Sequence, residues 1–250
     1  MKFSEEQVRS WMDAVKHTPD MMECLMGLQY LKHHAPAEKW NIQREDVVAH
    51  WVEGILQHPH MIECFWPSQI KSKIWLAEWQ RKYLPSAQRA IIFGCWYGVL
   101  ADILDIDQIE CQDKEIGYLD WVNLRYKTHT GCLSKFEYYR AFFGQKNKRP
   151  DVVINTITEH LTQEIYDEWY AKIPEKTYYI IQGNDDSSLD DHVRTFKDLD
   201  EFNKLNNVKN CLDSGVQEYQ GPWNFEKEEP TFKHRFMTIG FKDVGENKSS

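Results

Sequence analysis

A turn between two glycines, at residues 94–98, is the part of the sequence best suited to hold a small ligand. The apolar run Ala90-Ile-Ile-Phe ends at Gly94, and apolar residues at helical spacing begin at about Gly98. This pattern predicts a buried strand, a turn and a helix. In an open α/β sheet, ligands bind beyond the carboxyl ends of the strands, and glycine lets a ligand approach the backbone closely.

The spacing of the glycines narrows the class of ligand. A dinucleotide-binding turn reads G-x-G-x-x-G, and a Walker A loop ends in G-K-[ST]. This turn instead reads Gly94-Cys-Trp-Tyr-Gly98. Because its bulky side chains leave less room for a pyrophosphate, the turn favours an uncharged or zwitterionic ligand of the nucleoside type.

An acidic residue follows at a suitable distance. Asp113 lies 19 residues after Gly94, at the end of the next expected strand. A carboxylate about 20 residues on, in this place, accepts hydrogen bonds from ribose hydroxyls. Glu110 and Glu115 are alternatives for the same role, and strand alternation does not decide among the three.

The elements that must position these residues alternate from residue 89 onward. Short apolar runs at 89–94, 151–155 and 177–184, with a helix-like segment at 159–171, are typical of an α/β fold with a mainly parallel sheet. Residues 208–220 and 234–242 predict two further strands that pair antiparallel at the sheet edge.

Residues 1–84 show helical patterns instead. Segments 5–17 and 44–58 have the period of amphipathic helices. Residues 11–29 resemble residues 51–69 without a gap, which predicts two similar helical hairpins that pack on each other. Two copies are too few for a solenoid, which needs about three repeats. The matched positions include Trp11 and Trp51, Pro19 and Pro59, and Cys24 and Cys64.

Composition and charge exclude several classes of protein. The chain has 250 residues, 42% of them hydrophobic, and a formal net charge of −9. This describes a soluble globular protein, and its acidity argues against a nucleic-acid partner, which usually needs clustered Lys and Arg. No apolar stretch approaches the roughly 18 residues of a membrane span. The N-terminus lacks the apolar core of a signal peptide, so we expect a cytoplasmic protein without a membrane partner.

Cysteine and histidine spacing gives no sign of a metal site. The six cysteines contain no C-x-x-C pair, which predicts reduced thiols, and the ten histidines contain no H-E-x-x-H motif. We therefore predict that the chain holds no metal. His192 is interpreted as a structural histidine.

Two motifs, taken together with Asp113, resemble those of the class I S-adenosylmethionine-dependent methyltransferases. The motifs are the stretch Ile91-Ile-Phe-Gly-Cys-Trp-Tyr-Gly98 and the stretch Asp151-Val-Val-Ile-Asn-Thr-Ile-Thr-Glu-His160. Written as GxWYGxLA and DVVINTxxEH, they are similar to a subset found in phage and bacterial genomes, usually without an assigned substrate. If the chain is phage-encoded, its compartment would be the host cytoplasm.

The resemblance covers about residues 68–242 and implies a fold. It implies a Rossmann-like, doubly wound sheet of seven strands with an antiparallel C-terminal hairpin. Residues 85–245 would form the domain that binds S-adenosylmethionine, and residues 1–84 a helical region on the substrate side. The fourth strand is not followed by N-P-P-Y or D-P-P-Y, which argues against methylation of a nucleic-acid amino group.

The resemblance also assigns residues to the cofactor. Asp113 would bind the ribose, and the turn would enclose the methionine and ribose parts. Cys95 is interpreted as a small wall residue, because no Lys, Arg or His precedes it closely enough to lower its pKa. The turn residues assigned to the cofactor are Gly94, Cys95, Trp96, Tyr97 and Gly98.

Polar residues after the fourth strand are the catalytic candidates. Methyl transfer is an in-line displacement that requires alignment of the acceptor and removal of its proton. Asn155 would lie at the sheet edge beside the reacting methyl group, Glu159 could accept a hydrogen bond from a substrate amine, and His160 could act as a base. The alternative is a helix N-terminus that Thr156 or Thr158 caps, with Glu159 complementing the helix dipole.

Two other segments are candidates for binding. Asn184 and Asp185 follow the fifth strand and could bind a polar substrate or simply form a turn. Gln69 and Lys71 could reach a carboxylate of the cofactor or substrate, or be exposed residues of an amphipathic helix.

The sequence thus predicts a methyltransferase that acts on a small molecule or a protein side chain. Its acidity favours a neutral or cationic acceptor. Two alternatives stay open: an enzyme that transfers the aminocarboxypropyl group or cleaves S-adenosylmethionine, and a binding protein with a degenerate pocket. The oligomeric state stays open as well.

Overall fold

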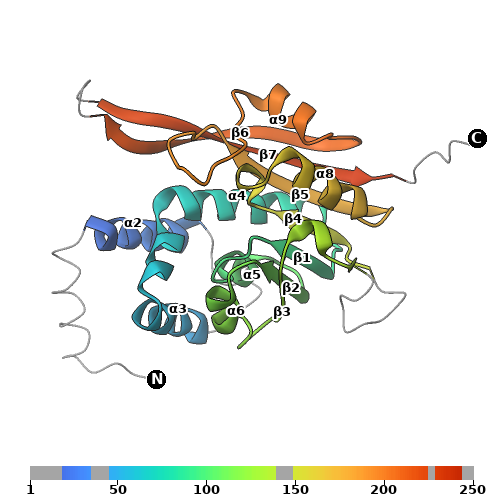
Figure 1. The fold of residues 1–250 in the computed structure, drawn as a ribbon. Coiled ribbons are helices and arrows are strands. Elements are labelled where there is room, and N and C mark those ends of the chain that lie inside the picture. Colours follow the sequence, from blue (N-terminus) through green and yellow to red (C-terminus); the bar gives the residue numbers. More distant parts are fainter. Residues whose placement is uncertain (1–18, 35–44, 139–148, 225–228, 244–250) are drawn as a thin grey trace, which may run out of the picture. The chain divides into compact units, whose positions relative to one another are not determined.

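The computed structural model describes most of the chain, in two compact units (Figure 1). The first unit comprises Met1–Glu78 with Asp102–Asp105, and the second comprises Trp79–Ala101 with Ile106–Ser250. The helix expected over 5–17 lies outside the described residues. The described residues are 19–34, 45–138, 149–224 and 229–243.

The first unit is helical. Helix α3 confirms the amphipathic segment predicted at 44–58. The related positions Cys24 and Cys64 are both buried, and a Cβ added to Gly27 would lie 1.6 Å from the carbonyl oxygen of Phe65. The two related segments therefore pack on each other, although one is an α-helix and the other begins as a 3-10 helix. The elements of the first unit are α2 (Pro19–His34), α3 (Glu45–Gln57), the 3-10 helix η2 (Pro59–Phe65) and the start of α4 (Pro67–Tyr83).

The second unit is built on a seven-stranded sheet with the order β3-β2-β1-β4-β5-β7-β6. Strands β1 to β5 pair in parallel, and β7 runs antiparallel to both β5 and β6. This confirms the Rossmann-like sheet with a C-terminal antiparallel hairpin. The strands are β1 (Arg89–Phe93), β2 (Gln108–Asp113), β3 (Lys127–Thr130), β4 (Val152–Asn155), β5 (Thr177–Asn184), β6 (Cys211–Asn224) and β7 (Glu229–Lys242).

Strand order reverses at β1, which has β2 on one side and β4 on the other. This is the switch point at which open α/β sheets bind ligands. Short helices follow most of the parallel strands. They are α5 (Val99–Ile103), α6 (Ile116–Val122), the 3-10 helices η3 (Leu133–Lys135) and η5 (Thr158–His160), α8 (Gln163–Lys172) and α9 (Leu199–Leu205).

The helix expected to begin at Glu159 begins instead at Gln163, so that part of the prediction is wrong. The side chain of Thr162 accepts a hydrogen bond from the backbone N–H of Ile165 at 3.4 Å and caps α8. The threonine cap of the alternative interpretation is wrong too, because the hydroxyls of Thr156 and Thr158 donate to the carbonyl oxygens of Gly94 and Gln182. Glu159 lies in a separate 3-10 turn.

Large aromatic side chains fill the core on one face of the sheet. Phe93 of β1 meets Trp169 of α8 edge to face, with ring centroids 5.5 Å apart, and Tyr166 of α8 is also fully buried. The Tyr166 hydroxyl donates to the carbonyl oxygen of Asn206 at 3.0 Å, so its burial leaves no polar atom unpaired. Among the described residues, we find no helix that is both long and apolar enough to cross a membrane.

Candidate active site

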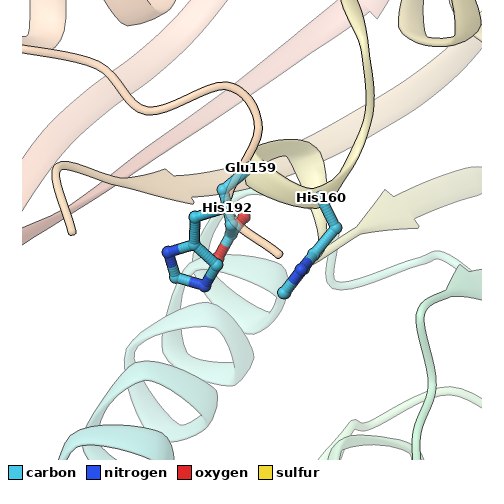
Figure 2. Close-up of side chains that lie close together, drawn as sticks. All are labelled: Glu159, His160 and His192. Atoms are coloured by element: carbon cyan, nitrogen blue, oxygen red, sulfur yellow. The ribbon is translucent and has the colours of Figure 1, made fainter. Parts of the chain in front are cut away.

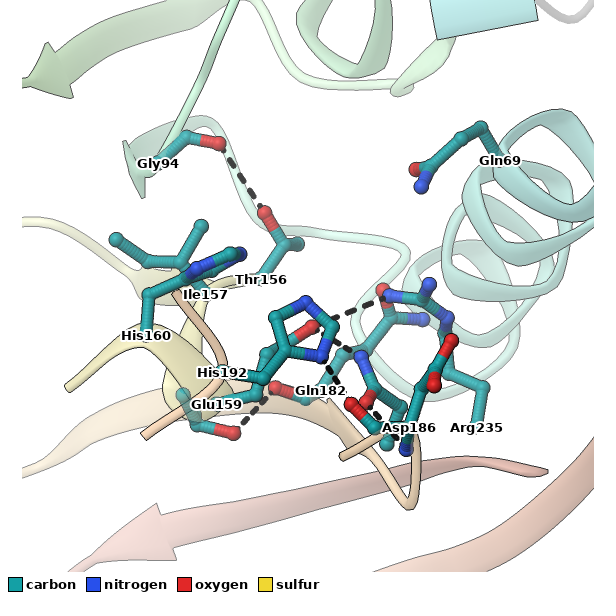
Figure 3. Close-up of polar contacts among 12 residues, drawn as sticks. Gln69, Gly94, Thr156, Ile157, Glu159, His160, Gln182, Asp186, His192 and Arg235 are labelled. Atoms are coloured by element: carbon teal, nitrogen blue, oxygen red, sulfur yellow. Dashed lines mark hydrogen bonds and ion pairs between the residues drawn. The ribbon is translucent and has the colours of Figure 1, made fainter. Parts of the chain in front are cut away.

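The turn after β1 has an unusual backbone. Gly94 and Gly98 have φ of 69° and 78°, and Trp96 between them has φ of 50°. A Cβ added to Gly94 would lie 2.2 Å from Cγ2 of Ile157, which follows β4. The hydroxyl of Thr156 donates to the carbonyl oxygen of Gly94 at 3.2 Å (Figure 3). Position 94 therefore needs a glycine for two reasons: its backbone is left-handed, and it packs closely against the segment after β4.

Asp113 holds this turn to the end of β2. Its side chain is 9% exposed. Oδ2 accepts a hydrogen bond from the backbone N–H of Trp96 at 3.0 Å, and Oδ1 accepts one from Glu115 at 3.2 Å. A carboxylate has about four acceptor sites, so each oxygen can accept one bond more. Asp113 can thus shape the turn and still bind a ligand hydroxyl.

The two alternatives to Asp113 are placed differently. Glu110 is buried against β3, where it pairs with Lys127 at 3.1 Å and with His129. Burial alone would raise the pKa of Glu110, but the hydrogen bonds from His129 and Lys127 lower it below its usual value. Glu115 is exposed at the start of α6. Asp113 accepts a hydrogen bond from the backbone of the glycine turn, whereas Glu110 pairs with residues of β3.

The two aromatic rings of the turn pack near Tyr118 of α6. Tyr97 lies 4.8 Å from Tyr118 between ring centroids, and Trp96 lies 6.5 Å from Tyr118. Tyr118 was not among the sequence candidates, because no motif marks it. Cys95 is buried, and burial raises the pKa of its thiol well above the usual value, assisted by a hydrogen bond with Cys111. Such a thiol is a poor nucleophile at neutral pH.

Two buried amides flank the last residue of β1. Phe93 is in register with Gln112 of β2 and with Asn155 of β4. Within the described part of the chain, Oε1 of Gln112 and Nδ2 of Asn155 have no hydrogen-bond partner. The other atom of the Asn155 amide, Oδ1, accepts from the N–H of Ile157 at 3.0 Å. Buried polar atoms are normally paired, so a free acceptor and a free donor beside β1 fit a polar ligand.

Glu159 follows β4 and is 3% exposed. Its Oε1 accepts a hydrogen bond from Nδ2 of Asn184 at 2.6 Å. The same oxygen lies 3.8 Å from Nη1 of Arg235, and Figure 3 shows Glu159 and Arg235. Its Oε2 has no hydrogen-bond partner among the residues that the structure describes. Arg235 was missed in the sequence, although an arginine within the apolar pattern of a strand was a usable signal.

Two histidines lie beside this carboxylate (Figure 2). The rings of His160 and His192 are 4.7 Å apart between centroids and meet edge to face. One potential ligand atom from each of Glu159, His160 and His192 lies within 4.8 Å of the others. No sequence motif predicts this group, because His192 comes from the loop after β5.

The two predicted substrate-binding residues are held by the protein itself. Besides bonding Glu159, Asn184 accepts from the backbone N–H of Asp186 at 2.9 Å. Asp185 accepts from the backbone N–H of His234 at 2.8 Å and pairs with its ring at 2.7 Å. These contacts make Asn184 a positioning residue for Glu159 and tie Asp185 to β7. Substrate contact at Asn184 and Asp185 stays a prediction.

Gln69 and Lys71 lie on α4, within the first unit. Lys73 donates to Oε1 of Gln69 at 3.2 Å, and Nζ of Lys71 lies 5.3 Å from the ring centroid of Tyr30. Their predicted contact with a cofactor or substrate carboxylate stays a prediction, as does the role of residues 1–84 on the substrate side.

Solved structures share this fold at low sequence identity. A presumed methyltransferase from Bacillus halodurans C-125 matches with a TM-score of 0.50 and 10% identity, over 71% of this chain and 100% of that one. TehB from Haemophilus influenzae matches with a TM-score of 0.48 and 11% identity, over 69% of this chain, which spans 62% of TehB. The N-methyltransferase NodS from Bradyrhizobium japonicum WM9, in complex with S-adenosylhomocysteine, matches with a TM-score of 0.47 and 10% identity, over 70% of this chain and 88% of NodS.

The sheet order and the similarity to the Bacillus halodurans protein show that this chain has a Rossmann-like fold of the kind found in methyltransferases. Identities this low show the fold alone. No protein-family model matches the sequence, and no curated protein matches it either.

Proposed function

We propose that the protein is an S-adenosylmethionine-dependent methyltransferase that acts on a small molecule or on a protein side chain. The observation that carries this proposal is the set of groups at the switch point of the sheet. A glycine turn tied to Asp113 lies there, flanked by the unpaired buried amide atoms of Gln112 and Asn155. S-adenosylmethionine is a zwitterionic nucleoside whose ribose diol suits a carboxylate, and whose amino-acid end suits a free donor and acceptor.

The residues of the chain divide the work of binding and alignment. Asp113 accepts hydrogen bonds from the ribose hydroxyls, and the rings of Trp96 and Tyr97 flank the ligand. The bound cofactor supplies an electrophilic methyl group. Glu159, held by Asn184, aligns the acceptor through a hydrogen bond to its N–H or O–H. A protein net charge of −9 favours a neutral or cationic acceptor.

Calorimetry tests the binding half of the proposal. We expect S-adenosylmethionine and S-adenosylhomocysteine to bind with dissociation constants in the micromolar range that is common for enzyme ligands. NADH and ATP serve as control ligands, since the turn lacks the motifs that hold a pyrophosphate. If neither adenosyl compound binds to folded protein, the proposal is wrong.

Product analysis tests the reaction. Incubation with S-adenosylmethionine and pools of amines, hydroxy compounds or peptides should release S-adenosylhomocysteine only when an acceptor is present. Release of methylthioadenosine instead would establish aminocarboxypropyl transfer or cleavage of the cofactor. Tight binding without any product from these pools would favour the third alternative, a binding protein.

A further inference from the structure

We infer that Glu159, His160 and His192 form a binding site for a divalent transition-metal ion. The three side chains come from the 3-10 turn η5 and from the loop after β5, and Figure 2 shows them close together. The inference rests on these side chains and not on the proposed methyl transfer.

The hydrogen bonds of the two histidines leave their second nitrogens available. Nδ1 of His160 lies 3.1 Å from the carbonyl oxygen of Asp191, and Nδ1 of His192 lies 2.6 Å from that of Asp186. A carbonyl oxygen can only accept, so both Nδ1 atoms carry a hydrogen. In a neutral imidazole this leaves a lone pair on Nε2. Histidines that bind metals typically have one nitrogen fixed in this way by a carbonyl or carboxylate.

The carboxylate of Glu159 supplies the third ligand. The residue is 3% exposed, and its Oε2 has no hydrogen-bond partner within the described ranges. An unpaired carboxylate oxygen is costly to bury, and a cation would satisfy it. Oε1 is held separately by Asn184 at 2.6 Å, with Arg235 at 3.8 Å, so the carboxylate is fixed in place while Oε2 is left for the ion.

This donor set selects a class of ion. Two imidazole nitrogens and one carboxylate oxygen suit Zn²⁺ and neighbouring first-row ions and leave coordination positions open, whereas Mg²⁺ prefers oxygen ligands. Bonds of about 2.0–2.2 Å to zinc require ligand atoms roughly 3–4 Å apart. One candidate ligand atom from each of the three residues lies within 4.8 Å of the others in this structure. A small rotation of the exposed His160 side chain would close the site.

A metal at this place changes the role of His160. Its Nε2 lone pair would bind the ion, so His160 would not act as a general base. Oε2 of Glu159 would bind the ion as well, so Glu159 would hold the acceptor through the ion and not by a direct hydrogen bond. The open positions of the ion would instead bind the acceptor oxygen or nitrogen and lower its pKa.

Metal titration of the full-length, chelator-treated protein tests the inference. We expect one Zn²⁺ or Co²⁺ per chain and affinity for Mg²⁺ at least 100-fold weaker. His160→Gln and His192→Gln should each weaken Zn²⁺ binding by at least tenfold. His60→Gln is the matched control, because the His60 side chain is 85% exposed in the first unit. This variant should bind Zn²⁺ with the affinity of the wild type. Equal affinity in all four proteins would overturn the site.

Two further measurements distinguish this site from an ion bound elsewhere on the chain. Spectra of the Co²⁺ protein should lack thiolate charge-transfer bands; their presence would place the ion on cysteines and overturn the site. Zn²⁺ should raise the Tm of the wild type and of His60→Gln but not of His192→Gln. His192→Gln should keep its affinity for S-adenosylhomocysteine within about twofold, so loss of the metal is distinguished from loss of the cofactor pocket.

Discussion

Replacement of Asp113 by Asn tests both roles that the structure gives this carboxylate. Asn has the same shape but only one acceptor oxygen, so its amide N–H₂ must face the N–H of either Trp96 or Glu115. Trp96 is half-buried and Glu115 is exposed, so loss of one of these hydrogen bonds should lower the free energy of unfolding by about 0.5–1.5 kcal/mol. Loss of the charged acceptor for the ribose should cost about 1.5–3 kcal/mol of binding, or roughly a 10- to 150-fold rise in Kd.

Urea unfolding and calorimetry with S-adenosylhomocysteine measure the two effects separately. Asp120→Asn is the control, because Asp120 is exposed on α6. The free energy of unfolding of this variant should differ from that of the wild type by no more than about 0.5 kcal/mol. If Asp113→Asn loses stability but binds the ligand within threefold of the wild type, the ribose contact is wrong. Unchanged stability would refute the account of the turn.

Three further predictions concern separate parts of the second unit. Gly94→Ala should destabilise the fold by about 1–2 kcal/mol because of the left-handed backbone at this position, and by more because the new Cβ clashes with Ile157. When Ile157 is also replaced by Ala, the Gly94→Ala substitution should therefore cost less. Additive changes in the free energy of unfolding, measured with urea, would contradict this. Cys132 is exposed, and a hydrogen bond from a neighbouring serine lowers the pKa of its thiol; mass spectrometry should find it alkylated before Cys211, whose thiol pKa is raised by burial. Because the pKa of Glu110 is lowered in the fold, its charge stabilises the protein above an unfolded pKa of about 4.3, and this stability is lost as the pH falls through the folded pKa. The stability difference between wild type and Glu110→Gln should therefore shrink from pH 6 to pH 3, and a difference independent of pH would show that the pairing contributes nothing.

Strands that are buried on both faces can be predicted from the sequence, because they consist of continuous apolar runs. This is why β1, β4 and β5 were predicted close to their observed bounds. By contrast, β3 is the four-residue strand Lys127–Thr130 at the sheet edge, and its residues are only partly buried. It carries no apolar run, so no sequence pattern marks it.

The residues that meet at the end of β4 depended on the tertiary structure. Glu159 and His160 are adjacent in sequence and were found as a pair, but their partners Asn184, His192 and Arg235 come from later segments. Those segments are brought to Glu159 by the β5 loop and by the register of the antiparallel β5–β7 pair. No local pattern encodes that register, since it depends on which side chains pack across the whole sheet.

The sequence by itself determined the order of the central elements, the glycine turn and three candidate carboxylates that follow it. Each of these depends on local geometry: strand period, positive φ at glycine, and a fixed chain length between β1 and the end of β2. Only the tertiary structure decided that Asp113 rather than Glu110 holds the turn, because the choice depends on which neighbours each carboxylate meets in space. Hydrogen bonds and charge pairs between distant segments are consequences of packing, and packing is a property of the whole fold.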